Sequence, residues 1–347
     1  MSDVRAYCLD CIRRRLFPGC AIAFGRGREN ARFVYAGMLS YQKSTPVDPD
    51  TWYDLASLTK PLATAAATLR ATAGQRLDPE SLLSDYFPEI RIRQARIRHL
   101  LSHSSGLPAY VPFFKDCGDG EEVIARIVAS EPAYPTGTKS VYSDLGFMLL
   151  GKILEITYGQ QFRDLVRTEV IEPLGARSIQ FGPLRPSESL KIAPTELDFR
   201  LHGFAAGIVH DENARLFGGA AAHAGLFATL PSVASLAQRL LLIARGQTDP
   251  VLPSDLFRSW IRRQSWLSNS SWGLGWDTPT PESSAGPALG ASSFGHTGFT
   301  GTSVWIDPEQ DIHICILSNR VHPSRRTEGM KEARRRIHRL ALDELSR

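Results

Sequence analysis

The chain has 347 residues, of which 43% are apolar, and 40 basic against 36 acidic side chains give it a net charge of +4. This composition supports a sizeable buried core and argues against disorder as the main state. The charge is too small to indicate a nucleic-acid partner, and no apolar stretch is long enough to cross a bilayer. The first residues carry charges throughout, without the apolar centre of a secretory signal. If Met1 is the true start, we expect a cytoplasmic protein.

The five cysteines are odd in number, so they cannot all pair, and reduced thiols fit a cytosolic protein. Cys8 and Cys11 form an isolated C-x-x-C inside an amphipathic segment. No second pair follows to complete a zinc site, and the motif does not open a helix after a strand, as a redox motif would. We therefore interpret both cysteines as core-facing helix residues.

The predicted elements begin with a helix over residues 3–16 and two strands over 20–27 and 32–39, joined by a polar turn. A helix rich in Ala, Leu and Thr follows over 58–73. The region 75–270 is predicted to be mainly helical and rich in loops, and its best helix candidates are 121–130, 144–157, 162–171 and 231–245.

After a loop over 277–293, the pattern changes to two strands, over 301–306 and 312–318, and a basic C-terminal helix. Apolar residues recur along that helix at helical spacing, which predicts one buried stripe and a solvated basic face; a contact surface for an anionic partner is the alternative. The economical arrangement joins both chain ends in one antiparallel sheet. We predict a single α+β domain over 1–347, with an α/β lobe from 1–60 plus 271–347 and a helical lobe over 61–270.

Ser57 and Lys60 form an S-x-x-K motif at the start of the helix predicted over 58–73. Residues three apart on a helix share a face, so Lys60 can reach the Ser57 hydroxyl. A lysine with the ordinary pKa of about 10.4 is a poor base, and burial beside other cations would free its amine to take the serine proton. Ser40 and Lys43 repeat the motif at a strand end, where this spacing does not bring side chains together. The alternative for Ser57 and Lys60 is an N-cap serine and a surface lysine.

His99 and His103 stand four residues apart, a spacing that also occurs in zinc sites. A zinc site needs a third ligand, and in the protease helix a Glu lies between the histidines, where this chain has Leu100 and Leu101. We interpret both histidines as structural, and predict no metal site.

Two later segments could complete a serine hydrolase site. Tyr142 precedes a predicted helix and could share a proton with Lys60 and pass it to a leaving group; its alternative is packing on the helical lobe. The second segment, 294–301, is rich in small residues that would let a substrate backbone lie along a strand edge, where a backbone N–H could polarise a carbonyl.

Taken in chain order, five segments resemble the class C β-lactamase and penicillin-binding-protein family, from about residue 17 to the end. They are Pro18-Gly19-Cys20-Ala21, Ser57-Leu58-Thr59-Lys60, residues 99–108 from His99 to Pro108, Tyr142-Ser143-Asp144 and His296-Thr297-Gly298. Order and spacing together are far more specific than one motif.

The resemblance implies a three-layer α-β-α sandwich, with an antiparallel sheet, terminal helices and an active site between the sheet and an inserted helical lobe. It also implies an acyl-enzyme on Ser57, a proton relay through Tyr142 and an oxyanion hole from the N–H groups of Ser57 and Phe299. Thr297 and Gly298 would contact substrate. No cofactor is implied.

Two residues depart from the family pattern. Asp144 replaces the usual Asn; a carboxylate cannot donate a hydrogen bond to a substrate amide, and it would favour the charged form of Lys60. His296 replaces the usual Lys, and a neutral imidazole is a weaker partner for a substrate carboxylate. Both changes argue against β-lactams and D-alanyl-D-alanine ends, and related proteins with His at this place are often esterases or peptide-hydrolysing enzymes.

The segment 207–225 carries His210, Asp211 and His223. It resembles the part of the same family that lines the cleft opposite the nucleophile, especially in cytosolic muropeptide-recycling N-acetylmuramyl-L-alanine amidases. A polar loop with a tight glycine-rich bend is the alternative.

The resulting hypothesis is a serine hydrolase that cleaves an ester or amide in a small molecule, peptide or muropeptide. A class C β-lactamase or D-alanyl-D-alanine carboxypeptidase is one alternative, and a catalytically silent, partner-binding or filament-forming relative is another. Neither a nucleic-acid nor a membrane partner is expected, and the sequence leaves the oligomeric state open.

Overall fold

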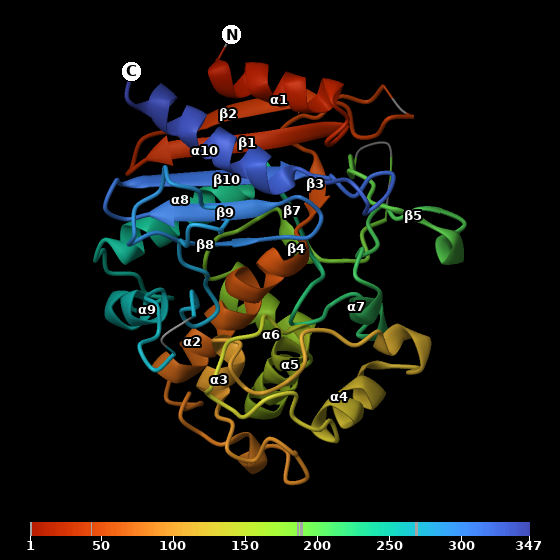
Figure 1. Ribbon diagram of the computed structural model, residues 1–347, viewed down its shortest axis with the longest axis vertical. Helices are drawn as coiled ribbons and strands as arrows, with labels where there is room; N and C mark the ends of the chain where they lie inside the picture. Colours follow the sequence, from red (N-terminus) through yellow and green to blue (C-terminus); the bar gives the residue numbers. More distant parts are fainter. Residues whose placement is uncertain (1, 43, 186, 188–189, 268–269) are drawn as a thin grey trace.

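A computed structural model describes residues 2–42, 44–185, 187, 190–267 and 270–347. Its largest sheet joins the two ends of the chain, as predicted, and all of its pairings are antiparallel (Figure 1). The strands run in the order β2 (Arg32–Gly37), β1 (Gly19–Arg26), β10 (Ile312–Ser318), β9 (Ser303–Asp307), β8 (Phe294–Thr297). The central strand β10 is buried along its whole length, because helices cover both faces of the sheet.

Alternation along the strands divides the buried side chains between the two faces. In β1, Ile22 and Phe24 pack with α1 (Asp3–Arg13) and α10 (Met330–Leu345), whereas Ala21 and Ala23 belong to the core on the opposite face. That opposite face is covered by α8 (Leu230–Ala244). The three expected layers are therefore present, but both terminal helices lie on one face, and a helix predicted to belong to the helical lobe completes the sandwich (Figure 1).

The apolar stripes of the terminal helices explain this packing. Cys8 and Cys11 are buried beside Cys20 of β1, as core-facing residues, and none of the five cysteines forms a disulfide. On α10, Met330 and Ile337 face the sheet, as predicted from their spacing. The basic face of α10 is less uniform than predicted, because one of its arginines is buried.

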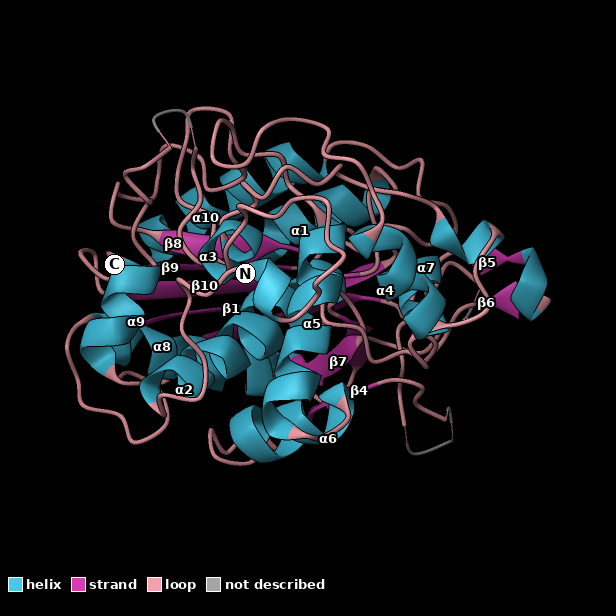
Figure 2. Cartoon of the chain, turned by 90° about the horizontal axis from the view of Figure 1, so that it is seen from below, coloured by secondary structure: helices cyan, strands magenta, loops and turns pink. Residues whose placement is uncertain are grey.

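The middle of the chain forms the helices below the sheet in Figure 1, and Figure 2 shows the molecule from below, with these helices towards the viewer. The helix predicted over 58–73 is divided into a 3-10 turn, a π-helical segment and α2, and the one over 162–171 into α6 and a π-helical segment. The elements are 3-10 turns Ala56–Leu58, Leu83–Asp85, Phe113–Lys115 and Phe199–Leu201, π-helical Lys60–Ala65 and Arg167–Ile171, α2 (Ala66–Ala73), α3 (Ile97–Leu101), α4 (Gly120–Val128), α5 (Asp144–Tyr158), α6 (Phe162–Val166), α7 (Glu212–Leu216) and α9 (Ser254–Trp260).

Two small sheets were not predicted, because their strands are only two to four residues long. The larger has the order β3 (Trp52–Asp54), β7 (Leu226–Thr229), β4 (Ile179–Phe181), and the smaller pairs β5 (Leu197–Asp198) with β6 (Gly203–Phe204). Pairing of β3 with β7 places the chain just after Asp54 beside the chain just before Leu226, which are far apart in sequence. Within the part of the chain described, no helix is long and apolar enough to span a bilayer.

Candidate active site

Ser57 lies on a turn that is held from both sides. The preceding residue, Ala56, has a φ of +47°, a conformation that costs energy for a residue with a Cβ. The buried carboxylate of Asp54 holds this turn, because it accepts hydrogen bonds from the N–H of Ala56 (2.8 Å) and from that of His210 (2.7 Å). The Thr59 hydroxyl accepts a hydrogen bond from the N–H of Leu226 at 3.1 Å. Local strain and tertiary hydrogen bonds thus fix the position of the Ser57 side chain.

Lys60 is fully buried and lies against Ser57, with 3.0 Å between Nζ and Oγ. The same nitrogen lies 2.7 Å from Oδ1 of Asp144 and donates to the carbonyl of His223 at 3.1 Å. Lys60 thus donates hydrogen bonds to Ser57 and His223, and its charge is paired with the carboxylate of Asp144. The helical spacing of the S-x-x-K motif therefore does bring its two side chains into contact.

The pKa of Lys60 is raised above its ordinary value. Burial alone would lower it, but the charge of Asp144 and the contact with Tyr142 together outweigh burial. The prediction that neighbouring cations would free the amine is therefore wrong, because the neighbour is a carboxylate. The expectation that Asp144 favours the charged form of Lys60 agrees with this direction.

Tyr142 packs against the same lysine, whose Nζ lies 4.9 Å from the centroid of the tyrosine ring. Burial raises the pKa of Tyr142, although the positive charge of Lys60 and hydrogen bonds with Lys60 and Ser57 oppose the increase. The phenol is thus protonated at neutral pH and can donate a proton. Its ring is enclosed by His103 and Trp272, with centroids at 4.6 and 5.5 Å.

The two histidines of the 99–103 segment support the backbone around the site. Nδ1 of His99 accepts a hydrogen bond from the N–H of Arg96 at 2.9 Å, and Nδ1 of His103 accepts one from the N–H of Ser143 at 3.0 Å. Burial lowers the pKa of His103 well below its ordinary range, so the ring is neutral and can accept this bond. His103 thereby positions the Tyr142-Ser143-Asp144 segment.

The serine of the decoy motif lies among the described residues. Ser40 is buried and its hydroxyl accepts a hydrogen bond from the N–H of Gln42. Lys43 lies outside the described residues.

His296 and Thr297 end the edge strand β8, and Gly298 follows. The imidazole of His296 is buried, and burial together with the nearby charge of Lys60 lowers its pKa to about 3. Nδ1 donates to the carbonyl of Thr297 at 2.9 Å, which leaves the lone pair on Nε2. His296 is therefore neutral across the physiological range, so a modest fall in pH does not give it a charge.

The edge of β8 is only partly open to a substrate. Gly295 exchanges two backbone hydrogen bonds, of 2.8 and 2.9 Å, with Asp277, so this part of the edge is occupied. The strand-edge surface predicted over 294–301 is thus limited to its C-terminal part. There, a Cβ on Gly298 would lie 2.5 Å from the carbonyl oxygen of Leu55, which explains the need for glycine, and the side chain of Phe299 is half-exposed.

A cleft of about 610 Å³ opens over these residues. It brings together Ser57, Tyr142 and Asp144 from the helical side with residues 296–299 from the sheet side. Its lining is Ala56, Ser57, Tyr110, Tyr142, Asp144, His210, Asp211, Glu212, Ala224, Trp272, Asp277, His296, Thr297, Gly298, Phe299, Arg320, Arg325 and Arg334. Of the three residues predicted to line the opposite wall, His210 and Asp211 do so, whereas His223 is buried behind them.

Two histidine–carboxylate pairs build that wall. Nε2 of His223 lies 2.9 Å from Oδ1 of Asp211, and burial, which would raise the pKa of Asp211, is outweighed by the interaction with His223 and a backbone hydrogen bond, so that this pKa is lowered. Nε2 of His210 lies 3.0 Å from Glu196, whose pKa falls to about 2 because hydrogen bonds with His210 and Arg325 outweigh burial. Asp211 is therefore ionised in the wall of the cleft.

Sequence reasoning missed the cleft residues of three loops and of the C-terminal helix. Trp272 and Asp277 lie in a segment without a recognisable motif. Arg325 and Arg334 were interpreted only as part of the basic C-terminal region, and Arg320 was not considered. No signal in the sequence identifies them, because they reach the cleft through the pairing of β8, β9 and β10.

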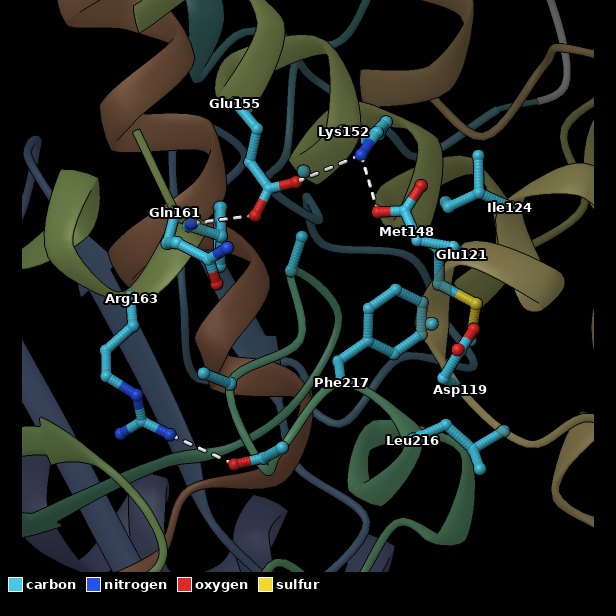
Figure 3. A pocket seen from close by; sticks show the side chains of 16 residues that line it. Asp119, Glu121, Ile124, Met148, Lys152, Glu155, Gln161, Arg163, Leu216 and Phe217 are labelled. Atoms are coloured by element: carbon cyan, nitrogen blue, oxygen red, sulfur yellow. Dashed lines mark hydrogen bonds and ion pairs between the residues drawn. The ribbon is translucent and has the colours of Figure 1, made fainter. Parts of the chain in front are cut away.

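A second pocket, of about 460 Å³, lies in the helical part of the molecule (Figure 3). Its charged groups are matched within the chain: Lys152 pairs with Glu121 at 2.6 Å and lies 3.7 Å from Glu155. Arg163 donates to the carbonyls of Gly182 (2.6 Å) and Gly218 (3.0 Å). None of the predicted site residues lines this pocket.

Comparison with known proteins identifies the family of this chain. The family model described as Beta-lactamase matches residues 9–339. The chain belongs to the beta-lactamase family. It is 32% identical over 327 residues to a "Putative D-alanyl-D-alanine carboxypeptidase" of Escherichia coli O157:H7, covering 83% of this chain and 73% of that protein. It is 28% identical over 348 residues to an N-acetylmuramyl-L-alanine amidase of Bacillus subtilis, covering 88% and 78%.

Solved structures of this family have the same fold. A beta-lactamase from Sulfitobacter sp. EE-36 matches with a TM-score of 0.77 at 21% identity, over 99% of this chain and 97% of that one. The octameric penicillin-binding protein homologue from Pyrococcus abyssi matches with a TM-score of 0.74 at 20% identity, over 98% and 76%. The α+β, β-lactamase-like fold predicted from the sequence is thus confirmed, and the chain is a hydrolase of this superfamily.

Proposed function

We propose that this protein is a serine hydrolase that forms an acyl-enzyme on Ser57 and cleaves an amide or ester bond in cell-wall-derived peptides or muropeptides. The observation that carries this proposal is the 3.0 Å contact of Ser57 with the buried Lys60, against which Tyr142 packs, beside an open cleft. The names of the two relatives, a carboxypeptidase and an amidase, support amide bonds of cell-wall peptides as the substrate class.

Lys60 is the residue that activates Ser57, although its resting form is the ammonium. When the Ser57 oxygen attacks the substrate carbonyl, its proton passes to Nζ of Lys60 while Lys60 gives a proton to Asp144, 2.7 Å away. The paired carboxylate thus allows a charged lysine to act as a general base in a concerted transfer. The departure from the family's usual Asn becomes part of the mechanism.

The leaving group takes its proton from Tyr142, which is protonated at neutral pH. Tyr142 recovers a proton from Lys60, and Lys60 recovers one from Asp144, so the relay returns to its starting state with an ester on Ser57 and a free amine or alcohol. The N–H groups of Ser57 and Phe299 would stabilise the oxyanion. Water then attacks the ester, loses a proton to the same relay, and Ser57 leaves as a hydroxyl.

A D-alanyl-D-alanine carboxypeptidase is the second candidate, favoured over a neutral esterase by the arginine side chains that line the cleft. A β-lactamase is a further candidate of the same chemistry. A silent, partner-binding relative is disfavoured by the contacts among Ser57, Lys60 and Tyr142, which such a protein does not need.

The test is intact-mass spectrometry after incubation with a fluorophosphonate, a nitrophenyl ester, a chromogenic cephalosporin and a muropeptide pool. We expect a covalent adduct that maps to Ser57 and is absent from Ser57→Ala, and chromatography of the pool should reveal which amide is cleaved. Full labelling of Ser57→Ala, or an adduct on another residue, would overturn the assignment. Absence of both adduct and turnover with every probe would favour a silent relative.

A further inference from the structure

Thr300 and Thr302 are two buried threonines in the loop that joins β8 to β9, and they are 1% and 0% exposed. The hydroxyl of Thr300 donates to the carbonyl of Asp54 at 2.7 Å, and the hydroxyl of Thr302 donates to the carbonyl of Leu55 at 3.0 Å. Asp54 and Leu55 directly precede the turn that carries Ser57. The two threonines therefore tie the loop after β8 to the chain just before the nucleophile.

The loop between β8 and β9 is closed by further hydrogen bonds. The N–H of Gly298 donates to the carbonyl of Thr302 at 2.8 Å, and Nη2 of Arg334 donates to the carbonyls of both residues at 3.0 and 2.8 Å. A Cβ on Gly298 would lie 2.0 Å from the hydroxyl oxygen of Thr302 and 2.5 Å from the carbonyl oxygen of Leu55. Because the loop is closed and fits without free space, a shift at either threonine would also move Phe299.

The segment that receives these hydrogen bonds is fixed as well. The N–H of Leu55 donates to the carbonyl of Leu226 at 2.9 Å, next to the pairing of β3 with β7. The carboxylate of Asp54 accepts the N–H groups of Ala56 and His210, which holds the turn before Ser57. Each threonine hydroxyl thus joins two segments that are already held by their own contacts, and it sets the separation between them.

These two segments carry the N–H groups of Ser57 and Phe299, the donors proposed for the oxyanion hole. Among the described residues, neither N–H group donates to a backbone carbonyl, so both are available to a substrate oxygen. An oxyanion hole depends on donors that are held in advance where the negative charge develops. A displacement of about 1 Å in such a site can lower the rate by about a hundredfold. The separation of the two donors is therefore a property that the threonine hydrogen bonds can control.

We propose that Thr300 and Thr302 are positioning residues for the oxyanion hole, because their hydroxyls hold the N–H of Phe299 in place relative to the N–H of Ser57. The inference rests on the proposed function and adds two residues to its machinery. Neither threonine is among the residues that line the cleft. Their effect should therefore appear in kcat, through stabilisation of the transition state, and leave KM unchanged.

The test removes each hydroxyl with little change in side-chain shape. Thr300→Val and Thr302→Val should each lower kcat on a nitrophenyl ester by about tenfold, less than the hundredfold to thousandfold that is lost with a whole oxyanion-hole donor. The affinity for phenylboronic acid, which adds to the Ser57 oxygen as a tetrahedral mimic of the transition state, should fall by a similar factor. Thr300→Ser and Thr302→Ser keep the hydroxyl and should retain wild-type values.

Thr68→Val is the matched control. Thr68 is also fully buried, and its hydroxyl donates to a backbone carbonyl, that of Thr64, at 2.7 Å. This hydrogen bond lies within one helical stretch and joins no two segments of the site, so its loss should leave kcat and the boronate affinity unchanged. Should a valine variant not fold, the alanine and serine variants at 300 and 302 give the same comparison, because both lack the methyl group and differ only in the hydroxyl.

The double variant Thr300→Val, Thr302→Val tests whether the two hydroxyls hold one loop. Loss of the second hydroxyl should then reduce kcat more than loss of the first, because one remaining hydrogen bond still limits the movement of Phe299. Wild-type kcat and boronate affinity in both single variants and in the double variant would overturn the positioning role, even if the wild type hydrolyses the ester through Ser57. The same conclusion would follow if the melting temperature fell while kcat stayed unchanged. Absence of turnover, of a Ser57 adduct and of boronate binding in the wild type would instead contradict the proposed function, and the positioning role with it.

Discussion

Lys60 and Arg334 are two buried cations of one cleft, and they differ in what surrounds them. Lys60 is 0% exposed and is balanced within the chain, because it donates hydrogen bonds to Ser57 and His223 and its charge is paired with the carboxylate of Asp144. Arg334 is 8% exposed; among the described residues its Nη2 donates to two backbone carbonyls, and its Nε is buried without a hydrogen-bond partner.

This difference indicates that the two cations have different roles in the cleft. A cation that is balanced internally can move protons without a substrate charge, so chemistry at Ser57 should proceed on neutral substrates. A cation that is not balanced gains most from a charged ligand, so it should contribute to selection. Mutations on the two sides should therefore have different signatures: loss of turnover with all substrates at Lys60, and loss of preference among substrates at Arg334.

The largest effect is expected at the balanced side. Ser57→Ala and Lys60→Ala should each lower kcat by at least about a thousandfold on neutral and charged substrates alike, because the two residues act as a unit. Steady-state assays with a nitrophenyl ester and a peptide check this. Ser40→Ala, in the decoy motif, serves as the matched control and should retain wild-type turnover; a Ser57→Ala enzyme with normal esterase activity would contradict the assignment.

A smaller loss is expected for Tyr142→Phe, which should slow acylation by about a hundredfold, the usual size of a lost acid–base step. The phenol is protonated at neutral pH and lies against Lys60, so its removal breaks the path to the leaving group. Single-turnover kinetics with an ester and an amide measure this rate. Wild-type acylation rates with both the ester and the amide would rule out the proton relay. A larger loss with the amide would support proton donation by Tyr142 to the leaving group, because an amine leaving group needs that proton more than an alcohol does.

Asp144→Asn should lower the plateau of kcat by about tenfold, the size of one lost contact to a charged group. It should also give the pH profile of kcat/KM an ascending limb that the wild type lacks, because without the carboxylate that takes a proton from Lys60 only the free amine can accept the serine proton. Asp144 holds the pKa of Lys60 up, and without its charge the burial of Lys60 pulls that pKa down, so the free amine forms at lower pH. The matched control is Glu155→Gln on the same helix, which should keep the wild-type profile. A profile of Asp144→Asn without such a limb would show that Lys60 does not pass its proton to Asp144.

The sequence was sufficient for the elements with strong periodicity. The strands around Ile22 and Ile314 and the helix α5 were predicted because burial imposes their patterns over several residues. The strands of the β3-β7-β4 sheet were missed, because three or four residues carry no period. The placement of α8 on the sheet was missed as well. A buried apolar stripe shows that a helix packs against another element, but it does not identify that element.

The site divides in the same way. Ser57 and Lys60 could be predicted because their contact is local, set by one helical turn. The raised pKa of Lys60 could only be suspected from Asp144, and the low pKa of His296 depends on its burial. The burial of Arg334 could not be predicted, because nothing in a basic C-terminal helix indicates which of its arginines is buried.

The smallest effect is expected for an unbalanced charge of the opposite sign. Asp277 lines the same cleft and forms no ion pair within the described residues; its Oδ1 accepts hydrogen bonds from the Ser271 hydroxyl (2.6 Å) and the N–H of Thr278 (3.0 Å). Burial raises its pKa to about 6. Because the folded state then binds this proton more tightly than the unfolded state, stability falls as pH rises from about 4 to 6 and stays lower above that range.

Asp277→Asn keeps both acceptor contacts and cannot ionise, so it should be more stable than the wild type at pH 7.5, by about 2 kcal/mol. The gain should disappear near pH 4, where the wild-type carboxyl is neutral as well. Urea unfolding at a series of pH values measures both. Asp307→Asn is the control, because this buried carboxylate accepts four hydrogen bonds, from the N–H groups of Gly290, Glu309 and Gln310 and from the Gln310 amide, and the new NH₂ group would face donors. Asp307→Asn should therefore lower stability at pH 7.5. A loss of stability in both variants would show that the surroundings of Asp277 stabilise its ionised form, and that an unpaired charge in this cleft does not lower the stability of the fold.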